Sequence, residues 1–243
     1  MKKIALRILA CSFLAQVILG TASAQDPGMP DSEEIPSSLM TFFVTSEPLG
    51  DGGNLGGLEG ADAHCQSLAT AVGAGAKTWV AYLSTQARPG QPAISARDRI
   101  GEGPWFHSTA KLLDYLQRRL NRPLIKSEIH GDTLEEAQRG SNMTKEFALT
   151  EHGELVSGIG DPLPTRHDIL TGSQPDGRAF TDSVDRTCNN WTSNDEGSTQ
   201  VGHSDRVGNG NLSWNSSHAT TGCSQEELVS WGGVGLFYCF ATD

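Results

Sequence analysis

Three side chains suited to metal binding or proton transfer lie close together in the second half of the sequence. His203 and Asp205 stand in a Gly-His-Ser-Asp string, and His218 follows in Ser-Ser-His-Ala. Imidazoles and carboxylates bind transition metals and also form acid–base pairs. The group therefore indicates a metal-dependent enzyme as one hypothesis. Its alternative is structural, because both strings are also typical of loops that are stabilised by side-chain hydrogen bonds.

The common signatures of hydrolases and nucleotide-binding proteins are absent from this sequence. It contains no G-x-S-x-G, no H-E-x-x-H and no P-loop. Each of these motifs places a nucleophile, a metal ligand or a phosphate cradle at a fixed spacing. The enzyme hypothesis therefore rests on the histidine–aspartate group alone.

The stretch that must position these residues, from Asp168 to Phe240, is rich in Gly, Asn, Ser and Asp. That composition is typical of long loops held by disulfides rather than by a large core. Three tryptophans lie in it, and we expect them to pack in the core and under loops rather than to form a sugar-stacking platform. They are Trp191, Trp214 and Trp231.

The N-terminus reads as an export signal. Residues 1–24 combine a basic start, an apolar run and small residues, which predicts cleavage after Ala24; a lipid-modified Cys11 is the alternative. Residues 25–40 are acidic and rich in proline, so we expect a flexible leader followed by one domain over residues 41–243. The protein is thus predicted to be secreted, periplasmic or on the cell surface.

The net charge and the cysteine content limit which partners and metal sites this chain can have. Losing the signal removes three basic residues and lowers the net charge from −11 to −14, which argues against nucleic acid and heparin as partners. The body of the chain has no apolar run long enough to span a membrane. Four cysteines remain and can pair in three ways; a zinc site is disfavoured because they show no CxxC spacing.

Hydrophobic spacing predicts a mixed α+β domain. Strands are expected over residues 41–46, 78–84 and 229–239, and helices over 58–72, with Cys65 on the buried face, and over 111–120. Residues 96–106 read as a short helix followed by a loop, and 147–156 as two strands around a His152-Gly153 turn. Residues 121–142 show no period and are expected to form a surface excursion.

Several of these segments together resemble the endostatin-like branch of the C-type lectin-like fold. They are the helix with Cys65, the strand TWVAYLS, the string SQPDGRAFTDSVDRTCNNW and the final GLFYCF. The resemblance implies nested disulfides, Cys65 with Cys239 and Cys188 with Cys223. Each would stabilise the domain by about 3 to 5 kcal/mol in the loop-entropy model. Endostatin's heparin-binding arginine surface and N-terminal zinc histidines have no counterpart here.

The resemblance also suggests a calcium site. Sugar-binding C-type lectins hold Ca²⁺ with a tripeptide such as Q-P-D, an acidic residue before the next cysteine and a W-N-D triplet. Here Gln174 and Asp176 match the first, Asp185 the second and Asn215 the third, although Ser216 replaces the last aspartate. The alternative is that Q-P-D-G simply forms a β-turn.

We therefore expect a secreted, non-enzymatic protein that binds an extracellular glycan or protein through the loops between Thr171 and Cys223, with calcium as a candidate cofactor. The competing hypothesis is a metal-dependent enzyme on the same scaffold that uses His203, Asp205 and His218.

Overall fold

The computed structural model describes residues 39–109, 123–130, 143–162, 164–206 and 213–243. All of them belong to one compact unit, Pro36–Asp243. The expected signal, most of the leader and the helix predicted over 111–120 lie outside the described residues. No described helix is long and apolar enough to cross a membrane.

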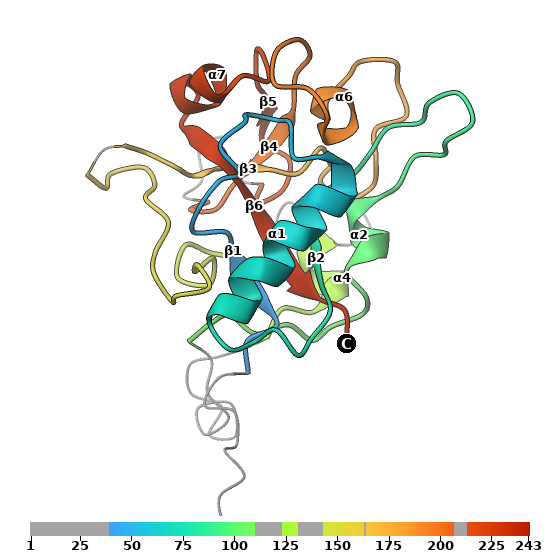
Figure 1. The fold of residues 1–243 in the computed structure, drawn as a ribbon. Helices are drawn as coiled ribbons and strands as arrows, with labels where there is room; N and C mark the ends of the chain where they lie inside the picture. The colour runs from blue at the N-terminus through green and yellow to red at the C-terminus, as the bar shows by residue number, and fades with distance from the viewer. Residues whose placement is uncertain (1–38, 110–122, 131–142, 163, 207–212) are drawn as a thin grey trace, which may run out of the picture. The chain divides into compact units, whose positions relative to one another are not determined.

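One six-stranded sheet organises this unit, and β6 (Gly233–Ala241) is its central strand (Figure 1). The sheet order is β1-β6-β3-β4-β5, and β2 also pairs with β6. Only the β3–β6 pair is parallel. The other strands are β1 (Phe42–Val44), β2 (Trp79–Ala81), β3 (Asp168–Leu170), β4 (Gln200–His203) and β5 (His218–Ala219).

Strand β6 is almost entirely apolar because both of its faces are covered. Side chains alternate between the two faces of a strand. Tyr238 and Phe240 accordingly join a core with Tyr82 and Trp214, whereas Phe237 and Cys239 join a second core on the opposite face. A strand buried on both sides reads as a continuous hydrophobic run, which is what GLFYCFA does.

Helix α1 (Gly57–Ala71) covers the second core and confirms the predicted helix to within one residue at each end. It buries Ala61, Cys65 and Ala69 at helical spacing. The Cys65–Cys239 disulfide joins this helix to the central strand, with 5.6 Å between the two Cα atoms. The crosslink therefore fixes α1 on the sheet.

Irregular segments cover the opposite core. Short helices α2 (Ala96–Arg99) and α4 (Lys126–His130) contribute to this cover, and α2 matches the predicted short helix. The prediction of a surface excursion over 121–142 was wrong for its described part, 123–130. Leu124 pairs with Trp105 in an isolated bridge, and Leu124, Ile129 and His130 are fully buried. Three buried residues in eight positions show no period that sequence inspection can detect.

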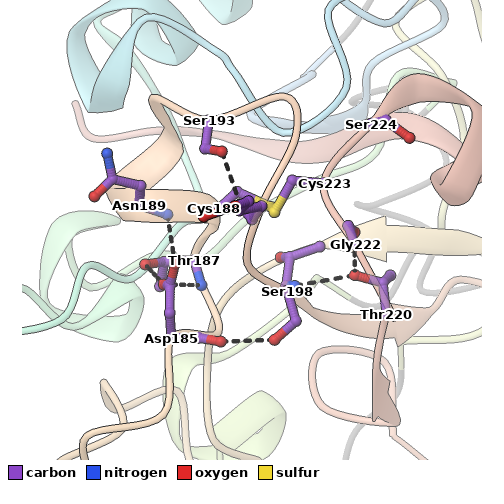
Figure 2. The surroundings of a disulfide bond; sticks show 12 residues. Asp185, Thr187, Cys188, Asn189, Ser193, Ser198, Thr220, Gly222, Cys223 and Ser224 are labelled. Atoms are coloured by element: carbon purple, nitrogen blue, oxygen red, sulfur yellow. Dashed lines mark hydrogen bonds between the residues drawn. A yellow bond between two sulfur atoms is a disulfide. The ribbon is translucent and has the colours of Figure 1, made fainter.

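The loop-rich second half begins with a left-handed turn. All four residues of α6 (Cys188–Trp191) have φ between 47° and 67°, a conformation that costs L-residues about 1–2 kcal/mol each. Several contacts hold it. Trp191 is fully buried and its Nε1 donates to the carbonyl of Ser84 at 2.8 Å. The second disulfide, Cys188–Cys223, anchors the turn to the segment before α7 (Gln225–Ser230) (Figure 2).

Two other expectations need correction. The strand predicted over 229–239 begins only at Gly233, because Val229 and Ser230 end α7. Residues 147–156 form a turn with the isolated bridges Leu149–Leu155 and Thr150–Val44 instead of two strands. Trp191 and Trp214 are fully buried as expected, whereas Trp231 is 42% exposed. The domain is thus a mixed α/β domain with one sheet and two disulfides.

Candidate functional site

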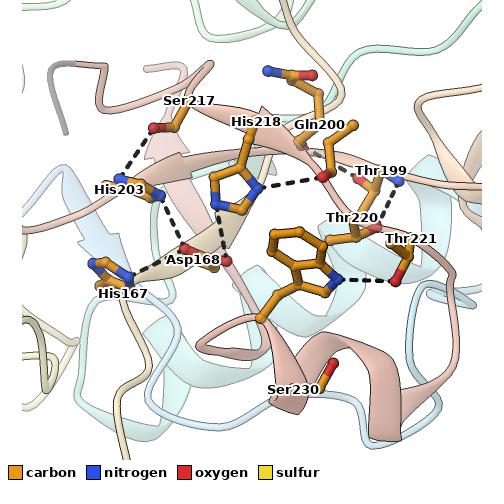
Figure 3. Close-up of polar contacts among 12 residues, drawn as sticks. His167, Asp168, Thr199, Gln200, His203, Ser217, His218, Thr220, Thr221 and Ser230 are labelled. Atoms are coloured by element: carbon orange, nitrogen blue, oxygen red, sulfur yellow. Dashed lines mark hydrogen bonds and ion pairs between the residues drawn. The ribbon is translucent and has the colours of Figure 1, made fainter. Parts of the chain in front are cut away.

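Three imidazoles converge on one buried carboxylate at the ends of strands β3, β4 and β5 (Figure 3). The Nε2 atoms of His167 and His203 lie 3.4 and 3.1 Å from Oδ1 of Asp168. His218 Nε2 lies 3.4 Å from the other oxygen, Oδ2. The side chain of Asp168 is only 2% exposed, so this cluster is set into the protein.

Strand pairing explains how residues far apart in sequence meet here. Asp168 is the first residue of β3 and pairs directly with His203, the last residue of β4. Directly opposed residues in an antiparallel pair project to the same face. His218 opens β5 opposite Val201, which is two residues before His203 and therefore on that face as well.

Each imidazole is oriented by a contact on its other nitrogen. His167 Nδ1 lies 2.9 Å from Oδ1 of Asp205, and His203 Nδ1 lies 3.0 Å from the Ser217 hydroxyl. His218 Nδ1 lies 3.3 Å from the carbonyl of Ala219. At His167 and His218 the carboxylate and carbonyl acceptors favour the proton on Nδ1, which leaves Nε2 as a lone-pair donor toward the centre of the cluster, whereas the Ser217 hydroxyl can act as donor or acceptor to His203.

The spacing of the cluster fits one metal ion. Two ligands at about 2.1 Å from a tetrahedral ion lie roughly 3.4 Å apart, close to the Asp168–imidazole distances of 3.1–3.4 Å. Ligand atoms of His167, Asp168 and His203 all lie within 4.8 Å of one another, and this is the one such group among the described residues. His218, on the other carboxylate oxygen, is outside that set. Three protein ligands leave one coordination position open.

The carboxylate at the centre is poorly satisfied without a cation. Both Asp168 oxygens are buried, and among the described residues neither accepts a hydrogen bond of normal geometry. The nearby imidazoles attract it nevertheless, since attraction between charges at these distances does not require an aligned N–H. Burial raises the pKa of Asp168, but interactions with His203 and His218 outweigh burial and bring this pKa below its usual value.

The pKa of His218 shifts in the direction opposite to that of Asp168. Its interaction with Asp168 raises the pKa of His218, against the opposing effect of partial burial. A proton on His218 therefore partly balances the buried negative charge of Asp168, a role that a bound cation would also fill. A ligand set of this kind binds metal in competition with protons.

Asp205 supports the cluster from behind. Its Oδ2 accepts a hydrogen bond from the backbone N–H of Ile159 at 2.6 Å, while Oδ1 faces His167. Gly158 makes this approach feasible, because a Cβ at that position would lie 2.3 Å from Oδ2 of Asp205. The carboxylate is only 1% exposed and is thus held on His167 from two sides.

The structure brings together the three residues that sequence inspection grouped, His203, Asp205 and His218, but around a centre that it missed. His167 and Asp168 do not belong to the group that the sequence indicates. A signal for them was present, since a His-Asp pair immediately before the buried residues Ile169 and Leu170 places polar side chains at the entry of a core strand. Only the β3–β4 pairing, however, identifies their partners.

The residues of the calcium prediction fall into two places. Asn215 is fully buried beside the Q-P-D turn, and its Nδ2 donates to the carbonyls of Gln174 and Pro175 at 3.2 Å. Its Oδ1 accepts a hydrogen bond from Ser213. Asp176 pairs with Arg178 through both of its oxygens, and Gln174 Nε2 donates to the carbonyl of Ala179 at 2.8 Å. These groups already have partners within the turn.

Asp185 serves the left-handed turn instead. Its Oδ1 accepts hydrogen bonds from the backbone N–H and the hydroxyl of Thr187, both at 3.0 Å, and its Oδ2 accepts from the backbone N–H of Asn189. Figure 2 shows this arrangement next to the Cys188–Cys223 disulfide. Calcium binding at Gln174, Asp176, Asp185 and Asn215 stays a prediction.

The two disulfides, Cys65–Cys239 and Cys188–Cys223, have the nested pairing that the endostatin-like resemblance implies. Comparison with known proteins adds no family to this geometry: no protein-family model matches the chain, and no curated protein matches it.

Proposed function

We propose that this chain is a secreted metal-dependent binding protein, in which His167, Asp168 and His203 hold a divalent transition-metal ion. The observation that carries the proposal is the convergence of imidazole Nε2 atoms on a buried carboxylate whose oxygens accept no hydrogen bond of normal geometry from the described residues. A buried, unsatisfied carboxylate costs stability, and an ion at this position removes that cost.

The donor set favours zinc. Imidazole nitrogen and carboxylate oxygen suit Zn²⁺, whereas Ca²⁺ takes six to eight oxygen ligands. Asp205 behind His167 supplies the carboxylate–histidine contact that commonly orients zinc ligands. A site of two histidines and one carboxylate also suits Fe²⁺, so the identity of the ion is a quantity to measure.

The binding role follows from the place of the cluster. His203 and His218 lie within the segment between Thr171 and Cys223 through which we expect an extracellular glycan or protein to bind. The C-type lectin-like scaffold belongs to this proposal and is supported by the helix, strand and cysteine pattern described above. Two disulfides are typical of proteins from oxidising compartments, which supports secretion after cleavage near Ala24.

A metal-dependent enzyme is the second candidate, and the open coordination position favours it. Structural zinc sites have four protein ligands, whereas sites with three leave room for water or a substrate. A metal-bound water is acidic enough to supply hydroxide near neutral pH. The described residues contain the metal ligands for such chemistry, and turnover of a substrate distinguishes it from binding alone.

Titration of Zn²⁺ into chelator-treated protein by calorimetry tests the proposal. We expect one ion per chain in the wild type. Asp168→Asn removes the anionic ligand at nearly constant volume and should lower zinc affinity by more than about 100-fold, since the loss of a supporting group alone costs 10- to 100-fold.

His152→Gln is the matched control, because the side chain of His152 is 53% exposed and lies outside the cluster. Zinc affinity should be unchanged in this variant, and near-ultraviolet circular dichroism establishes that both variants are folded. A wild-type protein that binds neither Zn²⁺ nor Fe²⁺ refutes the proposal. A parallel titration with Ca²⁺ tests the calcium prediction.

A further inference from the structure

A cleft with an apolar wall opens beside the histidine–aspartate cluster. It is a shallow, open cleft with a volume of about 450 Å³, and one cluster residue, His167, is part of its lining. Ligand pockets of this size are typically apolar with a few polar groups that fix orientation. The rest of the lining consists of Ile159, Pro164, Thr165, Val229, Ser230, Trp231 and Gly232.

The cleft reaches the metal-facing side of His167. A Cβ built on Gly232 would lie 3.5 Å from His167 Nε2, the nitrogen that points at Asp168. Because Gly232 has no side chain, the space beside that nitrogen stays open. The cleft and the ion position thus share a border at His167.

Trp231 forms a second connection between the cleft and the histidine–aspartate cluster. Its ring centroid lies 5.3 Å from that of His218, and its Nε1 donates to the hydroxyl of Thr221 at 2.9 Å. The hydrogen bond fixes an indole that is nevertheless 42% exposed. Ile159 and Val229 in the same cleft are 55% and 49% exposed, so three large apolar side chains face solvent together. Exposed apolar groups gathered next to polar ones mark binding sites.

The charge of the lining indicates the kind of ligand. The chain carries 29 acidic residues, yet no Asp or Glu is found among the described residues that line the cleft. These lining residues include no Lys or Arg either, so a bound dication would be the main attraction for an anion. An anionic oxygen is a suitable donor for the open position of a two-histidine, one-carboxylate ion.

We propose that this cleft binds an apolar carboxylate: the carboxylate completes the coordination of the metal ion, and the apolar group packs against Trp231, Ile159 and Val229. The inference rests on the proposed metal site. Its ligand chemistry has two sources, a free hydrophobic acid and the C-terminal carboxylate of a peptide that ends in a hydrophobic residue.

Calorimetry on the zinc-loaded full chain tests it with three probes. N-acetylphenylalanine represents the free acid, Gly-Gly-Gly-Phe the chain end, and N-acetylphenylalanine amide lacks the carboxylate. We expect the first two to bind and the amide to bind at least about tenfold more weakly, because it loses the anionic donor. Tighter binding of the tetrapeptide identifies a chain end as the source, and tighter binding of the free acid identifies a small molecule.

Two matched substitutions test the apolar wall. Val229→Gln puts a polar side chain into the cleft and should weaken probe binding by about fivefold through lost apolar contact. Val184→Gln makes the same change at a valine that is 53% exposed and outside the cleft, and probe affinity should not change. Neither residue belongs to the cluster, so zinc affinity should match the wild type in both.

The outcomes separate the two proposals. Zinc binding without binding of either carboxylate probe overturns the cleft proposal and leaves the metal site intact. Equal probe affinity with and without zinc overturns the coordination of the carboxylate, and an equal effect of both valine substitutions overturns the apolar wall. Failure of zinc itself to bind overturns the proposed function, and the cleft proposal with it.

Discussion

The buried pair of Tyr82 and His130 and the histidine–aspartate cluster differ in how completely their hydrogen bonds are formed. His130 accepts from the Tyr82 hydroxyl at 2.7 Å through Nε2 and donates to the carbonyl of Lys126 at 3.1 Å through Nδ1. Asn215 in turn donates to Tyr82. In the cluster, by contrast, imidazole nitrogens face Asp168 oxygens that accept no hydrogen bond of normal geometry among the described residues.

The difference shows how a structural histidine is told from a ligand. Both groups are buried and both lie near the sheet, so burial alone does not separate them. Burial, with the Arg97 charge as the next contribution, lowers the pKa of His130 to about 3, so it stays neutral and its two nitrogens make the two hydrogen bonds that a neutral ring allows. In the cluster, by contrast, imidazoles gather around the buried Asp168 carboxylate, whose oxygens accept no hydrogen bond of normal geometry among the described residues, and a cation can occupy that position.

The largest expected effect separates the groups by pH. His130 has a lower pKa in the folded protein than the unfolded value of about 6.5, so the unfolded state binds more protons between these values and stability falls as pH falls. The loss approaches about 1.4 kcal/mol per pH unit, or about 3 kcal/mol from pH 6.5 to 4. His130→Gln should flatten this dependence in guanidinium unfolding measured with chelator present.

His152→Gln replaces an exposed histidine and should keep the wild-type pH dependence. Carboxylates that titrate in this range are common to all three proteins and cancel in the comparison. Charged neighbours of His130 that also influence it are Arg97, Lys126 and Asp176. If His130→Gln and the wild type lose stability in parallel, His130 is not the neutral structural histidine described here.

A smaller effect is expected at Asp205, and it tests how His167 is oriented for metal binding. Asp205→Asn keeps the shape of the side chain but removes the charge that faces His167 Nδ1, so zinc affinity should fall by about 10- to 100-fold. Folding should persist, because an amide oxygen still accepts from Ile159. Calorimetry of Zn²⁺ binding measures the change, and an affinity within twofold of the wild type argues that His167 is not oriented by Asp205.

The smallest effect concerns the Q-P-D turn. Asp176→Ala removes a pairing with Arg178, whose side chain is 59% exposed, so stability should change by only about 0.5 kcal/mol. Zinc affinity should stay at the wild-type value, since Asp176 lies outside the cluster. A large drop in zinc affinity contradicts the assignment of the ion to His167, Asp168 and His203, and a loss of Ca²⁺ binding restores the calcium prediction.

The spacing of hydrophobic residues within single segments made part of the fold predictable. The apolar spacing around Cys65 indicates α1, and the hydrophobic run before Cys239 indicates the central strand, because burial of a face or of both faces leaves a direct trace in sequence. The left-handed turn at Cys188–Trp191 leaves only a weak one, because Asn189 and Asn190 tolerate positive φ whereas Cys188 and Trp191 rarely adopt it. Contacts with Thr187 and Gln86, together with the disulfide, hold the turn.

The same limit applies to the cluster. His203, Asp205 and His218 were grouped because they lie within sixteen residues of one another. His167 and Asp168 precede these residues by more than thirty positions in the sequence. They lie beside them because β3 pairs in parallel with β6 and antiparallel with β4. Such pairing is decided by the whole sheet and not by any segment of the sequence.

The position of β6 along the chain has a consequence for biosynthesis. This strand pairs with β1, about 200 residues earlier, and with β2 and β3, yet it is synthesised after all of them. Until residues 233–241 emerge, those three strands have no central partner, and Cys65 has no Cys239 to join. Completion of the sheet and formation of this disulfide therefore wait until the last segment of the chain has been synthesised.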